Sequence, residues 1–115
     1  MNKVTMYVPA PHCRIDVIKA SVRQDDDGLR KFWDADWEKN YVLIGQFFTE
    51  DVDIDACEDA FDLSNNPSRN NERKLVQGLS ESLSVGGVVK LEQRDDDSRV
   101  ETKFLMCLTV GWLEL

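Results

Sequence analysis

The stretch YVLIGQFFTEDVDIDACEDAFDL, residues 41–63, decides the fold class, because an apolar strand is followed within it by an acidic helix. Residues 41–48 are β-branched and aromatic in character and contain one glycine, which predicts a central strand. Residues 53–63 give the clearest helical pattern in the chain. The expected buried face of this helix consists of Ile54, Cys57, Ala60, Phe61 and Leu63.

The start of this helix is crowded with acid. Asp51, Asp53 and Asp55 fall where carboxylates favour the positive end of the helix dipole. Asp55 and Glu58 also have the spacing of a capping box. The sequence therefore predicts a helix that begins inside the acidic segment, and the run at 65–68, Asn-Asn-Pro-Ser, is expected to end it.

On the N-terminal side, alternating apolar residues predict a first strand. Val4, Met6 and Val8 alternate with more polar neighbours, and the prolines at 9 and 11 interrupt the pattern. The alternation resumes from Cys13 to Val22, which predicts a second strand. The acidic run Asp25, Asp26, Asp27 before Gly28 has the composition of a turn.

Residues 29–40 carry large apolar residues at helical spacing. Leu29, Phe32, Trp33 and Trp37 fall on one stripe of a short amphipathic helix. A loop held in place by the tryptophans is the alternative. Trp33 and Trp37 are expected to pack in or near the core, and the alternative is that they anchor a partner protein.

The last third of the chain has the alternating pattern of a β-sheet. Residues 88–93 and 100–110 alternate on either side of an acidic loop, Asp95, Asp96 and Asp97, which predicts a hairpin. Residues 69–77 are expected to form one or two helical turns before Gly78. The face of the second hairpin strand that is expected to lie on the core comprises Val100, Thr102, Phe104, Met106, Leu108 and Val110.

These elements predict a single domain over residues 1–115. Apolar residues make up 42% and charged residues 31% of the chain, which suits one globular core. The expected class is α+β, a mostly antiparallel sheet with one clear helix at about 53–63 and one or two short helices packed on it. No segment has the length and hydropathy of a membrane span or signal peptide, so a cytoplasmic location without membrane association is expected.

Three chemical sites can be set aside on spacing. Cys13, Cys57 and Cys107 are far apart, so they are expected to be reduced thiols and not zinc ligands. The Asp-rich segment fails as a calcium loop, because Ala56 occupies the position where the sharp turn needs glycine. His12 beside Cys13 is the remaining hypothesis for an enzyme. A catalytic thiolate needs a partner within hydrogen-bond reach, and adjacent residues on a strand point to opposite faces, so this pair is not expected to act together. No enzyme, metal or cofactor is predicted.

Three phrases in fixed order resemble a known family. They are Ala-Phe-Asp-Leu-Ser-Asn-Asn at 60–66, Ser-Leu-Ser-Val-Gly-Gly-Val-Val at 82–89 and Val-Gly-Trp at 110–112. Over residues 41–115 the chain resembles a family of small uncharacterised phage and plasmid proteins, with an Ala-Phe-x-Leu-Thr-Asn, Ser-x-Ser-Val-Gly-Asp-Val-Ile and Gly-Phe or Gly-Trp pattern. Gly87 stands where that family has aspartate. The resemblance implies a mobile genetic element acting inside a bacterial host cell.

The distribution of acid is the sharpest functional signal. The net charge is −8, and residues 41–67 contain seven carboxylates but no lysine or arginine. Together with the aspartates at 25–27 and 95–97, such a row of charge is typical of proteins that imitate a phosphate backbone. A solvated, well-capped helix face is the alternative. The seven carboxylates are Glu50, Asp51, Asp53, Asp55, Glu58, Asp59 and Asp62.

The expected function is therefore non-catalytic binding, and inhibition, of a host protein or nucleoprotein complex with a basic surface. Anti-CRISPR or antirestriction activity is its concrete form. Direct nucleic-acid binding is not expected from a net charge of −8. The alternative is a nucleic-acid-binding accessory module of a mobile element that uses the local basic cluster Arg69, Arg73 and Lys74.

Overall fold

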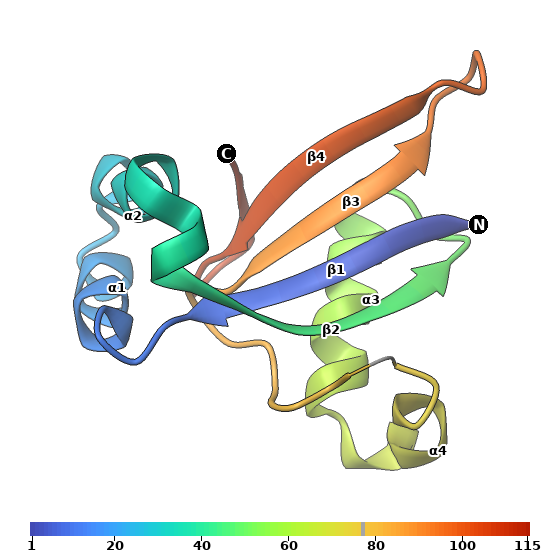
Figure 1. The fold of residues 1–115 in the computed structure, drawn as a ribbon, viewed down its shortest axis with the longest axis horizontal. Helices are drawn as coiled ribbons and strands as arrows, with labels where there is room; N and C mark the ends of the chain where they lie inside the picture. The colour runs from blue at the N-terminus through green and yellow to red at the C-terminus, as the bar shows by residue number, and fades with distance from the viewer. Residues whose placement is uncertain (77) are drawn as a thin grey trace.

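The strand predicted at residues 4–8 is present and lies inside a five-stranded sheet. The elements follow in the order β1 (Asn2–Pro9), α1 (Arg14–Val22), α2 (Asp26–Asn40), β2 (Tyr41–Thr49), α3 (Asp53–Asn65), the 3-10 helix η1 (Pro67–Arg69), α4 (Asn70–Arg73), β3 (Val88–Arg94), β4 (Val100–Cys107) and β5 (Trp112–Glu114). The spatial order is β2-β1-β3-β4-β5, and each neighbouring pair is antiparallel (Figure 1). This computed structural model describes residues 1–76 and 78–115, and it confirms the predicted α+β class.

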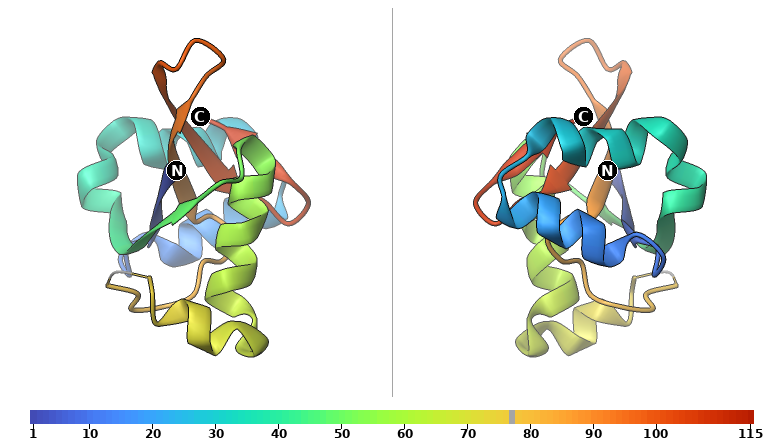
Figure 2. Two further views of the ribbon diagram at one scale, coloured as in Figure 1. Left: turned by 90° about the vertical axis from the view of Figure 1, so that its right-hand side faces the viewer. Right: turned by 90° about the vertical axis from the view of Figure 1, so that its left-hand side faces the viewer.

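Helices cover both faces of the sheet. β1 alternates between them, since Val4, Met6 and Val8 enter the core under α3, while Tyr7 enters a second core under α1 and α2. Each such buried side chain contributes about 1.5–3 kcal/mol through burial of apolar surface. The two further views show α3 along one side of the strands and α1 with α2 across one end of the sheet (Figure 2). Instead of one clear helix, three helices of nine or more residues surround the sheet.

The predicted strand from Cys13 to Val22 is wrong, because this segment forms α1. The residues that face the core are Cys13, Val17 and Ser21, which are spaced by four as on a helix. Ile15, which shared one face with Cys13 and Val17 in the predicted strand, is instead largely exposed, as are Ile18 and Val22.

The acidic run at 25–28 is also not the predicted turn. Asp25 caps α2, and its carboxylate accepts a hydrogen bond from the Gly28 N–H at 3.0 Å. Asp26 and Asp27 lie in the first turn of the helix. The predicted helix at 29–40 is confirmed, although it starts earlier and has a kink at Asp36.

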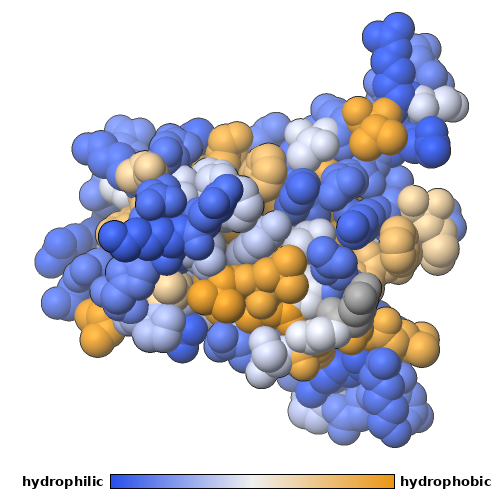
Figure 3. Space-filling view, viewed as in Figure 1, coloured by the Kyte–Doolittle hydropathy of each residue, from blue (hydrophilic) through white to orange (hydrophobic). Residues whose placement is uncertain are grey.

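β2 is an edge strand and not the predicted central strand. Consequently Val42, Leu43 and Phe48 are exposed, and a hydrophobic patch lies over this part of the molecule (Figure 3). A register shift between Met6 and Tyr7 interrupts the pairing with β1, and the Ser80 N–H donates to the Ile44 carbonyl at 3.0 Å. The irregularity and this contact both limit pairing of the edge with another chain.

The predicted hairpin is confirmed as β3 and β4. The predicted core face of its second strand is only partly correct. Met106 is buried and Phe104 is half-buried, but Val100 and Thr102 are exposed, because this end of the hairpin extends beyond the helices that cover the sheet. Val110 is exposed because β4 ends at Cys107 and Val110 lies in the turn that follows. The helical turns predicted at 69–77 are present as η1 and α4, and residue 77 lies outside the described residues.

Gly86 and Gly87 connect the loop to β3 and allow α1 to approach the sheet. Gly86 has φ +87°, and a Cβ atom there would overlap the Val17 Cγ1 methyl of α1. Its N–H donates to the Cys107 carbonyl at 2.7 Å, and the Cys107 N–H donates to the Gly87 carbonyl at 2.8 Å. The pair of glycines is therefore a structural turn.

Replacing Gly86 by alanine is expected to lower the free energy of unfolding by about 3 kcal/mol, from backbone strain plus the clash with Val17. Gly111→Ala is the matched control, because Gly111 also has positive φ, +81°, but has nothing within 4 Å of the added Cβ. The control should lose only about 1 kcal/mol. Urea unfolding of both variants measures the difference, and equal losses would show that contact with α1 does not matter.

Candidate functional site

α3 carries most of the acidic segment, and its first residue is tied to the sheet. Asp53 has φ +51°, and its N–H donates to Gln93 Oε1 at 3.0 Å. Its carboxylate accepts hydrogen bonds from Gln93 Nε2 at 2.7 Å and from Lys103 Nζ at 2.9 Å. The residue before the helix, Val52, supplies no side-chain cap, so the predicted capping box of Asp55 and Glu58 is wrong. Contacts with β3 and β4 hold the helix start instead.

These contacts change the protonation equilibrium of Asp53. The hydrogen bond from Lys103, followed by that from Gln93, lowers the pKa of Asp53 below its ordinary value. Asp53 in turn raises the pKa of Lys103 through the same hydrogen bond. The ionised form of this carboxyl group therefore stabilises the attachment of α3 to the sheet.

The far end of the acidic segment is held by Arg69. Its Nη1 lies 2.7 Å from Asp59 Oδ1 and 3.0 Å from Asp62 Oδ2, and its Nη2 lies 2.7 Å from Glu72 Oε2. The Arg69 side chain is only 20% exposed, so these ion pairs are partly shielded from water. The hydrogen bond from Arg69 lowers the pKa of Glu72. Two carboxylates of the segment are thus neutralised locally.

The middle of the helix presents what we call the α3 outer face. The helix buries Ala56, Cys57, Ala60, Leu63 and Ser64. The predicted buried positions 54 and 61 are wrong, since Ile54 is 52% and Phe61 is 36% exposed. The outer face therefore combines acidic and apolar side chains. It comprises Ile54, Asp55, Glu58, Phe61 and Asp62.

Three acidic residues beside or on this face have no cationic partner. Among the described residues, no ion pair involves Glu50, Asp51 or Asp55. Glu58 Oε1 accepts a hydrogen bond from Trp112 Nε1 at 2.8 Å, which orients its carboxylate without neutralising it. The centre of the helix therefore remains negatively charged.

The other acidic runs do not join this face. Asp25, Asp26 and Asp27 lie at the start of α2, at the end of the molecule where α1 and α2 pack. The turn at 95–97 projects at the opposite end, beyond β3 and β4 (Figure 1). A continuous row of charge over all three runs is thus not formed.

The basic cluster predicted for nucleic-acid binding is largely occupied. Arg69 is bound to carboxylates, and Arg73 donates to the backbone carbonyls of Leu63 at 3.2 Å and Asn66 at 3.0 Å. Only Lys74 of the three has no such contact among the described residues. These arginines fasten α4 to α3, which weakens the alternative of a nucleic-acid-binding module.

The two tryptophans are part of an aromatic cluster. Trp33 is buried and stacks on Trp37 at a centroid distance of 5.3 Å, and Tyr7 contacts both rings edge-on. Trp37 is 40% exposed at the margin of this cluster. Trp33 therefore packs in the core, as predicted. Of the two tryptophans, only Trp37 is exposed enough to contact a partner protein.

The thiols are buried and chemically unsuited to nucleophilic attack. Burial raises the pKa of Cys57 to about 12 and of Cys107 to about 11, and it also raises the pKa of Cys13. His12 Nε2 lies 3.1 Å from the Asn40 side-chain oxygen, while Cys13 Sγ is directed at the carbonyl oxygens of Ala10 and Asn40. In residues 1–76 and 78–115, no group of three His, Cys, Asp or Glu forms a metal-ligand set, and no helix is long and apolar enough to cross a membrane.

Sequence reasoning located the acidic helix but missed its anchors. Gln93 and Lys103 come from the hairpin, 40 and 50 residues beyond Asp53. Arg69 offered only a weak signal, because it follows Asp62 by seven residues and lies beyond the end of the helix. No protein-family model matches the chain, and no curated protein or solved structure gives a match. Its function is therefore inferred from its own residues.

Asp53→Asn is expected to remove a pH-dependent part of the stability. Because the pKa of Asp53 is lowered on folding, its contribution is complete above the ordinary value of 3.8 and is lost as pH falls through the folded value. The variant should lose less than about 1 kcal/mol at neutral pH, since the pair is half-exposed, and little more in acid.

Urea unfolding at neutral pH and at about pH 3 measures the effect. Asp55→Asn is the control, because it removes the same charge from the same turn without an ion pair. If acid lowers the stability of the wild type no more than that of Asp53→Asn, the pH-dependent stability does not come from Asp53.

Proposed function

We propose that this chain is a non-catalytic protein of a phage or plasmid that binds a basic surface of a host protein through the α3 outer face, and inhibits it. The target is a host protein or nucleoprotein complex in the bacterial cytoplasm, and anti-CRISPR or antirestriction activity is the concrete form. The observation that carries this proposal is the composition of the outer face. Exposed Ile54 and Phe61 lie beside Asp55 and Glu58, which form no ion pair within residues 1–76 and 78–115.

This combination suits a protein partner. Carboxylates facing a basic groove accelerate encounter and select the partner, while the affinity comes from apolar side chains that become buried at the centre of the interface. A partner with a groove made for phosphate would offer the required positive charge. The resemblance of residues 41–115 to a phage and plasmid family supports a target in the host cell.

The ion pairs engage some carboxylates of the acidic segment and leave others available for the proposed binding. Asp53 and Asp59 are engaged by Lys103 and Arg69, so changing them would disturb the helix as well as any interface. Asp51, Asp55 and Glu58 are exposed and have no cationic partner among the described residues. They are therefore the residues with which to test binding.

A tagged protein expressed in a bacterial host is expected to retain a basic protein on affinity purification. Asp51→Asn, Asp55→Asn and Glu58→Gln together should abolish that retention, and retention by the wild type should fall steeply with added salt. Glutamine at position 58 keeps an acceptor for Trp112.

The matched control changes Asp34, Asp96 and Asp97 to asparagine, which removes the same charge from exposed sites on α2 and the hairpin turn. This control should retain the partner. Retention of the same protein by the α3 triple variant at every salt concentration would sink the proposal.

A further inference from the structure

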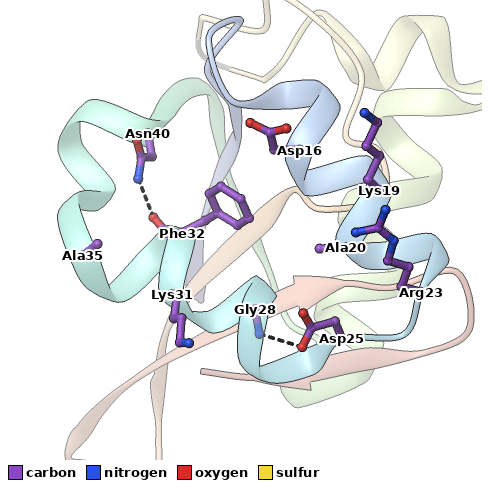
Figure 4. A pocket seen from close by; sticks show the side chains of 10 residues that line it. All are labelled: Asp16, Lys19, Ala20, Arg23, Asp25, Gly28, Lys31, Phe32, Ala35 and Asn40. Atoms are coloured by element: carbon purple, nitrogen blue, oxygen red, sulfur yellow. Dashed lines mark hydrogen bonds between the residues drawn. The ribbon is translucent and has the colours of Figure 1, made fainter.

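A groove lies between α1 and α2, at the end of the molecule where these two helices pack. Its volume is about 530 Å³, which is in the range of small-molecule sites (Figure 4). The groove lies against the two N-terminal helices and shares no lining residue with the α3 outer face. It is therefore a separate feature of the molecule.

The floor of the groove is apolar and supported from below. Ala20 and Phe32 line it, and both pack against the core formed by Tyr7, Val17 and Leu29. The Phe32 carbonyl accepts a hydrogen bond from Asn40 Nδ2 at 2.8 Å, as the dashed line in Figure 4 marks. This bond holds the backbone of Phe32, and the phenyl ring packs against the core without a ligand.

The rim of the groove is basic. Lys19 extends from α1, Arg23 from the position directly after α1, and Lys31 from α2. Within residues 1–76 and 78–115, none of these three side chains makes an ion pair or a hydrogen bond, unlike Arg69 and Lys103. The chain as a whole has a net charge of −8, yet three cationic side chains lie together at this groove. This local positive charge suits an anionic ligand.

The two carboxylates of the rim have different roles. Asp25 is engaged in capping α2, since its Oδ1 accepts from the Gly28 N–H. Asp16 makes no ion pair among the described residues and remains as an acceptor for a ligand N–H or O–H. The groove therefore offers cations, an acceptor and an aromatic surface within one volume.

We propose that this groove binds a small anion that carries a flat aromatic group, with a nucleoside monophosphate as its representative chemistry. The phosphate lies between Arg23 and Lys31, where guanidinium and ammonium groups form charge-assisted hydrogen bonds to its oxygens. The base lies on Phe32 and Ala20, where aromatic stacking is favourable for any base. Asp16 accepts from the base or the sugar.

The test is a titration of the ¹⁵N-labelled full chain with adenosine monophosphate, followed by amide chemical shifts. The amides of Ala20, Gly28 and Phe32 are expected to shift and saturate. Adenosine, which lacks the anion, and inorganic phosphate, which lacks the aromatic group, should each bind at least about tenfold more weakly.

Arg23→Gln with Lys31→Gln should weaken binding of adenosine monophosphate by about tenfold or more, because both phosphate partners are removed. The control is Lys74→Gln with Arg99→Gln, which removes the same charge from exposed sites far from the groove and should leave the affinity unchanged. The spectra themselves report whether each variant is folded.

Three outcomes would overturn the proposal: no saturating shift at the groove amides, equal weakening by the control pair, or adenosine binding as tightly as adenosine monophosphate. None of them depends on α3. Failure here is therefore distinguishable from failure of the proposed protein-binding role.

Discussion

The fold depends on β1 being enclosed on every side. It pairs with β2 along one edge and with β3 along the other, and its last six residues are buried. Since Val4, Met6 and Val8 require cover on one face and Tyr7 requires it on the other, a single layer of helices would leave apolar surface in water. The placement of α3 on one side and of α1 and α2 on the other follows from this one strand.

The sequence predicted those elements whose own residues carry the pattern. β1, the hairpin and α3 have apolar residues at the period of their structure, and all of them are present. α1 was missed because Val17 is its only buried large apolar residue, while Cys13 before it and Ser21 within it are small and Ile15, Ile18 and Val22 are exposed. Cys13, Ile15 and Val17 alternate as on a strand, and the local pattern does not show the close packing of Val17 on Gly86. The position of β2 at an edge likewise depends on strand order, which local pattern does not encode.

The candidate site was likewise predictable only in those features that each residue carries by itself. The density of acid on α3 was readable directly, because charge is a property of each residue. Which carboxylates are neutralised was not readable, because Lys103 reaches Asp53 from β4 and Arg69 reaches Asp59 from beyond the end of the helix. The basic cluster that suggested nucleic-acid binding is thereby explained, since Arg69 and Arg73 hold the α3–α4 corner together.

These anchors also make α3 a better binding surface than a free acidic helix would be. Lys103 holds its first residue and Arg69 holds its last turns, while Trp112 orients Glu58 between them. The helix therefore loses little conformational freedom when a partner binds, which reduces the entropic cost of association. The carboxylate of Asp55 remains unneutralised in the interval between the two anchors. The cations that the fold places on α3 are thus at its ends, where they stabilise the helix without removing the negative charge of its centre.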